Sequence, residues 1–218
     1  MSEAAKKPSA QPQTNKDSLL YAIAKPIVSL LLKTILPVKF HNRERLAQDP
    51  PYIVIANHSS MLDPVIIGVG VIGHQVRFIG KKELTKNKLA AWLFKQLRMI
   101  PVDRHNSDME AMRACMRVTR EGHVLGIFPE GTRHHDGLMT ELESGVAMIA
   151  LRSKVPLVPV YITRRLCPFR AVHVYVGEQI PMDDLREQGI NKETCDVLLK
   201  RITETYAEMV KLPAAKKS

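Results

Sequence analysis

The stretch PYIVIANHSSMLDPVIIGVGVIG, residues 51–73, decides the fold class of this chain. It opens with a short apolar run that follows two prolines, which predicts a buried strand over 51–58. A polar turn follows, and DPVIIGVGVIG at 63–73 predicts a helix. A buried strand that leads through a polar turn into a helix is typical of α/β sheets, which carry their functional residues on the loops after the strands.

The same alternation continues along the chain. Further apolar runs predict strands at 75–80, 98–104, 123–128, 155–163 and 171–177. Amphipathic stretches predict helices at 87–97, 107–122, 144–153 and 191–212. On the last helix, the predicted apolar side consists of Leu198, Ile202 and Met209. We therefore expect an α/β domain over 39–212, with a mixed, largely parallel sheet flanked by helices.

The segment before this domain, SLLYAIAKPIVSLLLKTILPV at 18–38, is strongly apolar. The uncharged runs beside Lys25 are about seven residues long, against the ~20 that a membrane-spanning helix needs. One polar stripe recurs every four residues, at Tyr21, Lys25, Ser29 and Lys33. Pro26 predicts a kink or a break into two short helices. We expect an interfacial segment that docks on one leaflet, and the alternative is a helix packed on the core.

Composition limits the class of protein. The chain has 218 residues, of which 45% are hydrophobic, so a sizeable core is expected and wholesale disorder is excluded. Lys and Arg number 32 against 22 Asp and Glu, a net charge of +10, which favours binding to a polyanion. The aromatic content of 5% and the lack of a nucleic-acid reader motif argue against nucleic acid. The anionic surface of a membrane is therefore the expected partner.

The chain ends and the cysteines give weaker indications. Residues 1–17 read as a disordered basic tail, and residues 213–218 as a second basic tail. The three cysteines are odd in number and widely spaced, at Cys115, Cys167 and Cys195, which excludes a disulfide framework and favours roles as small apolar filler. On the helix at 107–122, the stripe Arg113, Arg117 and Arg120 predicts a solvated face, and the alternative is a membrane contact.

The first polar loop is NHSSMLD at 57–63. A neutral imidazole is the natural base near pH 7, and a carboxylate on its far nitrogen fixes the tautomer. His58 and Asp63 supply these two groups. Asp63 is alternatively a helix N-cap, since Pro64 follows at the first helical position. A hydrolase that uses Ser59 or Ser60 is a rival, although the chain lacks a Gly-x-Ser-x-Gly elbow there.

The second polar loop is FPEGTR at 128–133. Its glycine permits a tight turn, Thr132 offers a hydroxyl, and Arg133 offers a planar fork that matches phosphate. Glu130 could steer that arginine. A third loop carries Arg104 just beyond a predicted strand end, a position where an isolated arginine is usually solvated.

Together these loops resemble the glycerolipid acyltransferase family. NHSSMLD resembles that family's Asn-His-x-x-x-x-Asp signature, and FPEGTR resembles its phosphate-binding signature. PVDR at 101–104 and VPLVPVY at 155–161 fall where the second and fourth blocks of the family fall. The resemblance covers about residues 38–180 and is closest to the bacterial 1-acylglycerol-3-phosphate acyltransferases. It implies an α/β core beside an N-terminal membrane-docking helical element on the cytoplasmic face of the cell membrane.

The resemblance also implies roles for residues. His58 would take the proton from the free hydroxyl of lysophosphatidic acid, and Asp63 would orient His58. The activated oxygen would attack an acyl thioester of coenzyme A or acyl carrier protein, giving phosphatidic acid without a metal or a redox cofactor. The acceptor phosphate would be held by Glu130, Gly131, Thr132 and Arg133, with Arg104 and Lys81. The alternatives are another lysolipid or glycerol 3-phosphate as acceptor, or a non-catalytic lipid-binding module.

Two positions depart from the family pattern. Met61 stands where many members have an aromatic residue. Glu143 and Ser144 stand before Gly145, where many members carry one or two lysines. Because a carboxylate would oppose a phosphate, either this position faces away or the acceptor head group differs. The pair His134 and His135 does not predict a metal site, because adjacent residues rarely point the same way.

Overall fold

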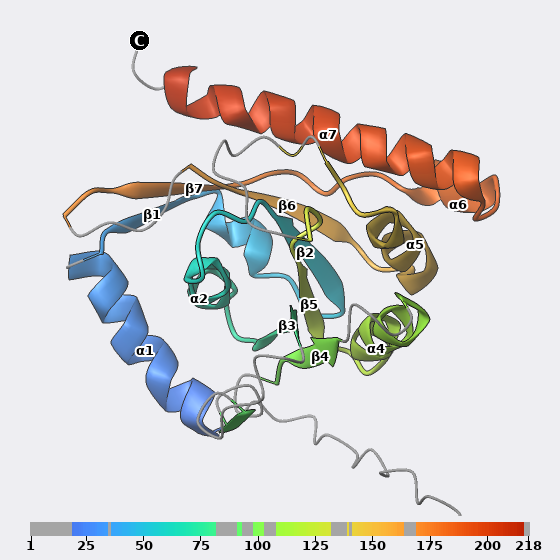
Figure 1. Cartoon of the computed structure of the whole chain (residues 1–218). Helices are drawn as coiled ribbons and strands as arrows, with labels where there is room; N and C mark the ends of the chain where they lie inside the picture. Colours follow the sequence, from blue (N-terminus) through green and yellow to red (C-terminus); the bar gives the residue numbers. More distant parts are fainter. Residues whose placement is uncertain are drawn as a thin grey trace, which may run out of the picture.

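A seven-stranded sheet forms the centre of the described part of the chain, in the order β1-β7-β6-β2-β5-β3-β4 (Figure 1). The computed structural model describes residues 19–34, 36–81, 91–92, 98–102, 108–131, 139, 141–163 and 169–215. The strands are β1 (Val38–His41), β2 (Tyr52–Ala56), β3 (Val76–Lys81), β4 (Ile100–Val102), β5 (Val124–Ile127), β6 (Leu157–Ile162) and β7 (Val172–Val176). β6 and β7 are antiparallel and the other neighbouring pairs are parallel, which confirms the predicted mixed sheet.

Helices cover both faces of this sheet (Figure 1). They are α1 (Leu19–Thr34), the 3₁₀ helix η1 (Arg43–Leu46), α2 (Asp63–Gly70), α4 (Asp108–Arg120), α5 (Ser144–Ser153), α6 (Asp183–Glu187) and α7 (Lys192–Ala215). Ile53 and Ile55 of β2 pack in a core with α4, α5 and α7. The alternate residues of β2 pack with α2 and η1 in a second core. β2 is therefore buried on both faces, which explains its uninterrupted apolar run.

Most expected elements lie where the sequence predicted them. The helix at 144–153 is α5, and α7 begins at Lys192 but continues to Ala215, beyond the predicted end at 212. The sequence analysis missed β1, η1 and α6, each only four or five residues long. Of the helix predicted at 87–97, only residues 91–92 are described, and they are helical. The tail predicted at 1–17 lies outside the described residues.

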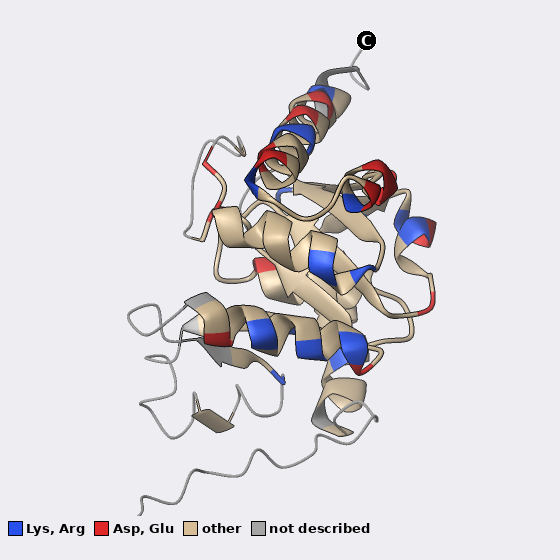
Figure 2. Cartoon of the chain, turned by 90° about the vertical axis from the view of Figure 1, so that its right-hand side faces the viewer, with Lys and Arg blue, Asp and Glu red and all other residues tan. Residues whose placement is uncertain are grey.

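Two smaller predictions can also be compared with the fold. Cys115 and Cys195 are buried, as expected of apolar filler, and burial raises the pKa of Cys115 to about 12. Cys167 lies outside the described residues. Figure 2 shows basic positions along α4, and the side chains of Arg113, Arg117 and Arg120 are exposed, as both a solvated face and a membrane contact require.

The N-terminal helix α1 is inverted relative to an ordinary surface helix. Two of its polar residues face the body of the protein: the Tyr21 hydroxyl donates to the Gly68 carbonyl over 2.9 Å, and Lys25 Nζ donates to the Val71 carbonyl. The exposed side instead carries large apolar residues, Leu19, Ile23, Ile27 and Leu30, which are 54–77% exposed. The predicted break into two helices is wrong, since one helix runs from Leu19 to Thr34 through Pro26.

Candidate active site

The two polar loops start side by side because the strands before them are neighbours. β2 pairs in parallel with β5, with Ile55 opposite Ile127. The first loop therefore leaves β2 beside the point where the second loop leaves β5. His58 lies two residues after β2, and Glu130 lies three residues after β5. This is the edge of a parallel sheet at which ligands usually bind.

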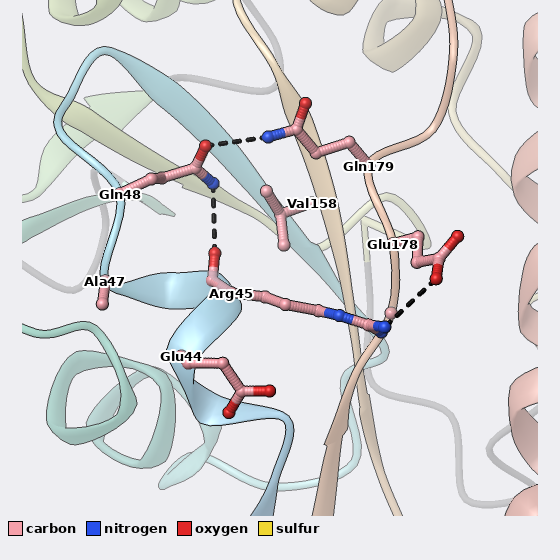
Figure 3. Close-up of a pocket in the computed structure, with 8 residues that line it drawn as sticks. Glu44, Arg45, Ala47, Gln48, Val158, Glu178 and Gln179 are labelled. Carbon is pink, nitrogen blue, oxygen red and sulfur yellow. Dashed lines mark hydrogen bonds and ion pairs between the residues drawn. The ribbon is translucent and has the colours of Figure 1, made fainter.

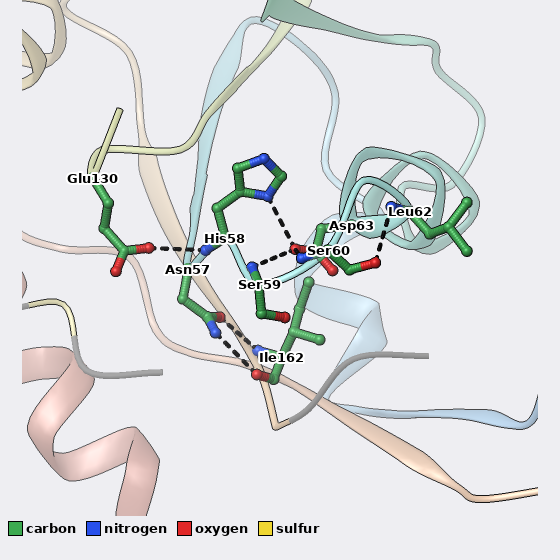
Figure 4. Close-up of polar contacts among 8 residues, drawn as sticks. All are labelled: Asn57, His58, Ser59, Ser60, Leu62, Asp63, Glu130 and Ile162. Carbon is green, nitrogen blue, oxygen red and sulfur yellow. Dashed lines mark hydrogen bonds and ion pairs between the residues drawn. The ribbon is translucent and has the colours of Figure 1, made fainter. Parts of the chain in front are cut away.

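His58 and Asp63 are in contact (Figure 4). His58 Nδ1 lies 3.0 Å from Asp63 Oδ2. The Asp63 side chain is completely buried, whereas that of His58 is 19% exposed. A carboxylate on Nδ1 favours the tautomer in which Nδ1 donates, and this tautomer leaves the lone pair of Nε2 to accept a proton. The pair predicted from the sequence is therefore assembled in the fold.

Asp63 Oδ2 also holds the backbone of the loop. It accepts the N–H groups of Ser59 and Ser60, each over 2.7 Å (Figure 4). The alternative role of Asp63 as a helix N-cap is wrong, because α2 has its N-cap at Leu62 without a side-chain bond. Instead of capping the helix, the carboxylate fixes both the shape of the loop and the imidazole.

Glu130 joins the two loops. Its side chain is buried, and its Oε2 accepts the backbone N–H of His58 over 2.9 Å (Figure 4). This bond fixes the main chain of the residue that carries the imidazole. The predicted contact of Glu130 with an acceptor phosphate stays a prediction, since the contact that the structure gives this carboxylate is with the protein itself.

Gly131 and Glu143 meet at the second loop. Gly131 has φ 63°, in the left-handed region that favours glycine. A Cβ at Gly131 would lie 2.7 Å from Glu143 Oε1. The backbone N–H of Glu143 donates to the Pro129 carbonyl over 2.8 Å. The Glu143 side chain therefore lies beside Gly131, and the two alternatives stated for this position stay predictions.

Two residues beside the site were missed by the sequence analysis. Asn57 exchanges two hydrogen bonds with the backbone of Ile162, of 2.8 and 2.9 Å, which tie the end of β2 to β6 (Figure 4). Phe128 stacks on the His58 imidazole, with ring centroids 4.2 Å apart. Asn57 is the first residue of NHSSMLD, and Phe128 is the first residue of FPEGTR. Their positions in these two motifs were the sequence signal that could have identified them.

The remaining predicted site residues are not placed. Arg104, Thr132 and Arg133 lie outside the described residues, as do His134 and His135, for which no site was predicted. Lys81 ends β3, and only its backbone is described. The structure therefore brings together His58, Asp63, Glu130 and Gly131. The contribution of Arg104, Thr132, Arg133 and Lys81 to phosphate binding stays a prediction.

A pocket of about 350 Å³ lies elsewhere (Figure 3). It is formed by η1, the start of β6 and the segment after β7, and His58 does not line it. Arg45 in this pocket forms a 3.2 Å ion pair with Glu178 and donates to the Val176 carbonyl, so its guanidinium already has partners within the protein. The pocket is separate from the candidate site.

Comparison with known proteins decides the family. A sequence model described as Acyltransferase matches residues 37–163, more than half of the chain. The chain belongs to the acyltransferase family. The matched range of this acyltransferase contains both loops and runs from β1 to the end of β6.

Several relatives are named 1-acyl-sn-glycerol-3-phosphate acyltransferase. The Bacillus subtilis protein is 35% identical over 122 residues, which cover 56% of this acyltransferase and 60% of the relative. The Streptococcus pneumoniae protein is 28% identical over 201 residues, covering 88% and 74% of the two chains. This chain thus spans less than two thirds of the length of the Bacillus relative.

A solved structure shares the fold. The crystal structure of the 1-acyl-sn-glycerophosphate (LPA) acyltransferase PlsC from Thermotoga maritima matches with a TM-score of 0.63 at 24% identity. The match covers 87% of this acyltransferase and 78% of the other chain. The α/β architecture with mixed strand directions is therefore that of a known acyltransferase.

Proposed function

We propose that this acyltransferase moves an acyl group from an acyl thioester to the free hydroxyl of lysophosphatidic acid, forming phosphatidic acid. The observation that carries the proposal is the 3.0 Å contact between His58 Nδ1 and Asp63 Oδ2, at a loop of the sheet edge where ligands bind. The names of the Bacillus and Streptococcus relatives support this choice of acceptor.

The chemistry follows from these groups. His58 Nε2 accepts the proton of the acceptor hydroxyl as the oxygen attacks the thioester carbonyl. Asp63 stabilises the imidazolium that forms. When the tetrahedral intermediate collapses, the carbon–sulfur bond breaks and the thiol of coenzyme A or acyl carrier protein leaves with a proton. The thioester is already activated, so the reaction needs neither a nucleophilic serine nor a metal or redox cofactor.

We also propose that α1 docks this acyltransferase on the anionic, cytoplasmic surface of a membrane as a peripheral protein. The exposed apolar side of α1 has the properties of an interfacial helix, and Tyr21 and Lys25 on its other side are bound to α2 and its C-cap. Within the described residues, α1 and the other helices are too short or too polar to cross a bilayer. Met61 and Leu62, on the loop of His58, are also exposed and apolar.

An acceptor panel tests the reaction. The full chain is given a labelled acyl thioester with lysophosphatidic acid, glycerol 3-phosphate or an uncharged lysolipid, in anionic vesicles. We expect phosphatidic acid to be the main product. Preferred labelling of glycerol 3-phosphate or of the uncharged lysolipid would show that lysophosphatidic acid is not the preferred acceptor. Lipid binding without labelling would favour a non-catalytic lipid-binding module.

A matched pair of variants tests the base. His58→Gln should lower turnover by about 10²–10⁴-fold, the usual contribution of general base catalysis, while vesicle binding persists. His74→Gln is the control, because His74 is an imidazole beyond the far end of α2. Equal activities of the two variants would reject His58 as the base.

A further inference from the structure

We propose that Phe128 is a positioning residue that holds the His58 imidazole by ring stacking, and that Phe78 supports Phe128 from the neighbouring strand. This inference rests on the proposed function, in which His58 is the base. It concerns an aromatic column of three rings that lies beneath the candidate site, on the face of the sheet covered by α2.

The upper contact of the column restrains the base. The rings of His58 and Phe128 have centroids 4.2 Å apart and an angle of 24° between their planes. The hydrogen bond from Nδ1 to Asp63 fixes the edge of the imidazole, but by itself it allows the ring to turn about that bond. A flat ring against one face removes this rotation. The hydrogen bond and the stack together define where Nε2 points.

The lower contact depends on a glycine. Phe78 in β3 pairs with Gly126 in β5, and its ring lies 5.6 Å from that of Phe128 at an angle of 13°. A Cβ on Gly126 would lie 2.2 Å from Cε1 of Phe78 and 2.9 Å from Cγ1 of Val76. Any side chain at 126 therefore displaces Phe78. Gly126 provides the space in which the support of Phe128 can lie flat against β5.

The charges around the imidazole give the stack a second effect. Among the described residues, Asp63 Oδ2 contacts Nδ1 and the Glu130 carboxylate accepts the backbone N–H of His58. The π face of Phe128 lies on a third side and favours a cation over it. The positive charge that develops on His58 during proton transfer is therefore formed between a carboxylate and an aromatic face.

Two variants of Phe128 separate the effect of the aromatic ring from that of its apolar volume. Phe128→Leu keeps an apolar side chain but removes the stack, and Phe128→Tyr keeps the ring. We expect Phe128→Leu to lower kcat about tenfold with unchanged KM for acceptor and donor, because a misplaced base slows chemistry more than binding. Phe128→Tyr should keep kcat close to that of the unsubstituted protein. An unchanged kcat in Phe128→Leu, or a change confined to KM, would overturn the proposal.

A second measurement does not depend on activity. In protein labelled at its 8 histidines, the imidazole proton resonances of His58 are identified by their loss in His58→Gln. Stacking on Phe128 should shift them upfield by the ring current, and Phe128→Leu should remove that shift while the other histidine signals stay in place. Unmoved His58 resonances in Phe128→Leu would overturn the stack. Removal of the shift in a protein inactive on every acceptor would support the stack and reject the proposed function.

Glycine variants test the lower part of the column. Gly126→Ala should move the His58 resonances and lower kcat, because the new methyl group pushes Phe78 out of its place. Gly145→Ala is the control, since a Cβ built there meets no atom within 4 Å beyond its chain neighbours and the backbone of its own helical turn. If Gly126→Ala folds with unmoved His58 resonances, Phe78 does not support Phe128 and that part of the proposal is wrong.

Discussion

The first and last helices of this acyltransferase are both amphipathic, yet they face the sheet in opposite ways. α7 buries its apolar side: Leu198, Ile202 and Met209 are at most 5% exposed, as their spacing predicted. α1 instead directs Tyr21 and Lys25 inward and leaves its apolar side exposed. A periodic pattern therefore defines two faces of a helix, but the partners available in the fold decide which face is buried.

This difference separates stability from membrane binding. α7 lies over β6 and α5 and supplies much of one core. α1 is bound to the segment 68–71 through Tyr21 and Lys25, and it buries Leu32, so its exposed apolar residues add little to the folded state in water. We expect changes on α7 to affect unfolding and changes on the outer side of α1 to affect vesicle binding.

The largest effect is expected in the core beneath α7. Leu198→Ala should lower the free energy of unfolding by about 2–5 kcal/mol, because it leaves a cavity at a fully buried position. Leu30→Ala on α1, where the leucine is 63% exposed, should change it by less than about 0.5 kcal/mol. Urea unfolding monitored by circular dichroism measures both. Similar losses would mean that α1 is part of the core after all.

The next effect concerns lipid. The pair Ile23→Asp and Ile27→Asp should weaken binding to anionic vesicles by at least about 100-fold, because two isoleucines no longer enter the interface and two negative charges are added. Val197→Asp on α7 is the control, since this valine is 45% exposed on the other helix. Cosedimentation with vesicles measures the loss. Binding that survives the double substitution would exclude α1 as the docking element.

A smaller effect compares two tyrosines. The Tyr206 hydroxyl on α7 donates to the Ile55 carbonyl over 2.6 Å in a fully buried setting, and burial raises its pKa well above the usual range. Tyr206→Phe should cost about 1–3 kcal/mol, because buried polar groups lose a partner. Tyr21→Phe on α1 should cost about 1 kcal/mol or less, since Tyr21 is only partly buried. Thermal unfolding of the two variants ranks them, and the reverse order would contradict the comparison.

The smallest effect is a pH dependence on the side of α7. Hydrogen bonds from Arg201 hold the pKa of Asp184 below its ordinary value of 3.8 and join α6 to α7. Because the folded pKa is the lower one, this pair stabilises the fold above pH 3.8 and loses its contribution as the pH falls through the lowered pKa. Asp184→Asn should slightly lower the melting temperature at pH 7, and this loss should shrink as the pH is lowered below 3.8. A loss that stays the same as the pH is lowered would show that the charge of Asp184 does not cause it.

Sequence alone predicted much of this molecule. Local sequence patterns predicted the apolar run of β2, the helix α5 and the loop with His58 and Asp63. Each of these features depends on residues that are close together in the sequence. The contact between Glu130 and the backbone of His58 could not be predicted, since it depends on β2 and β5 being neighbours and the sequence does not state strand order. The stack on Phe128 and the inward direction of Tyr21 depend on the same tertiary placement.

The three donors that converge on Asp63 Oδ2 have a consequence for mutagenesis. An asparagine amide presents one oxygen and one NH₂ group. If the oxygen faces the ring nitrogen and the two backbone N–H groups, it is a weaker acceptor than a carboxylate. If the NH₂ group faces them, a donor is placed against three donors. Asp63→Asn would therefore disturb the path of the main chain at 59–60 together with the imidazole. The activity lost in that variant combines two defects. The loss of activity caused by a misoriented imidazole alone is measured better with substitutions at Phe128.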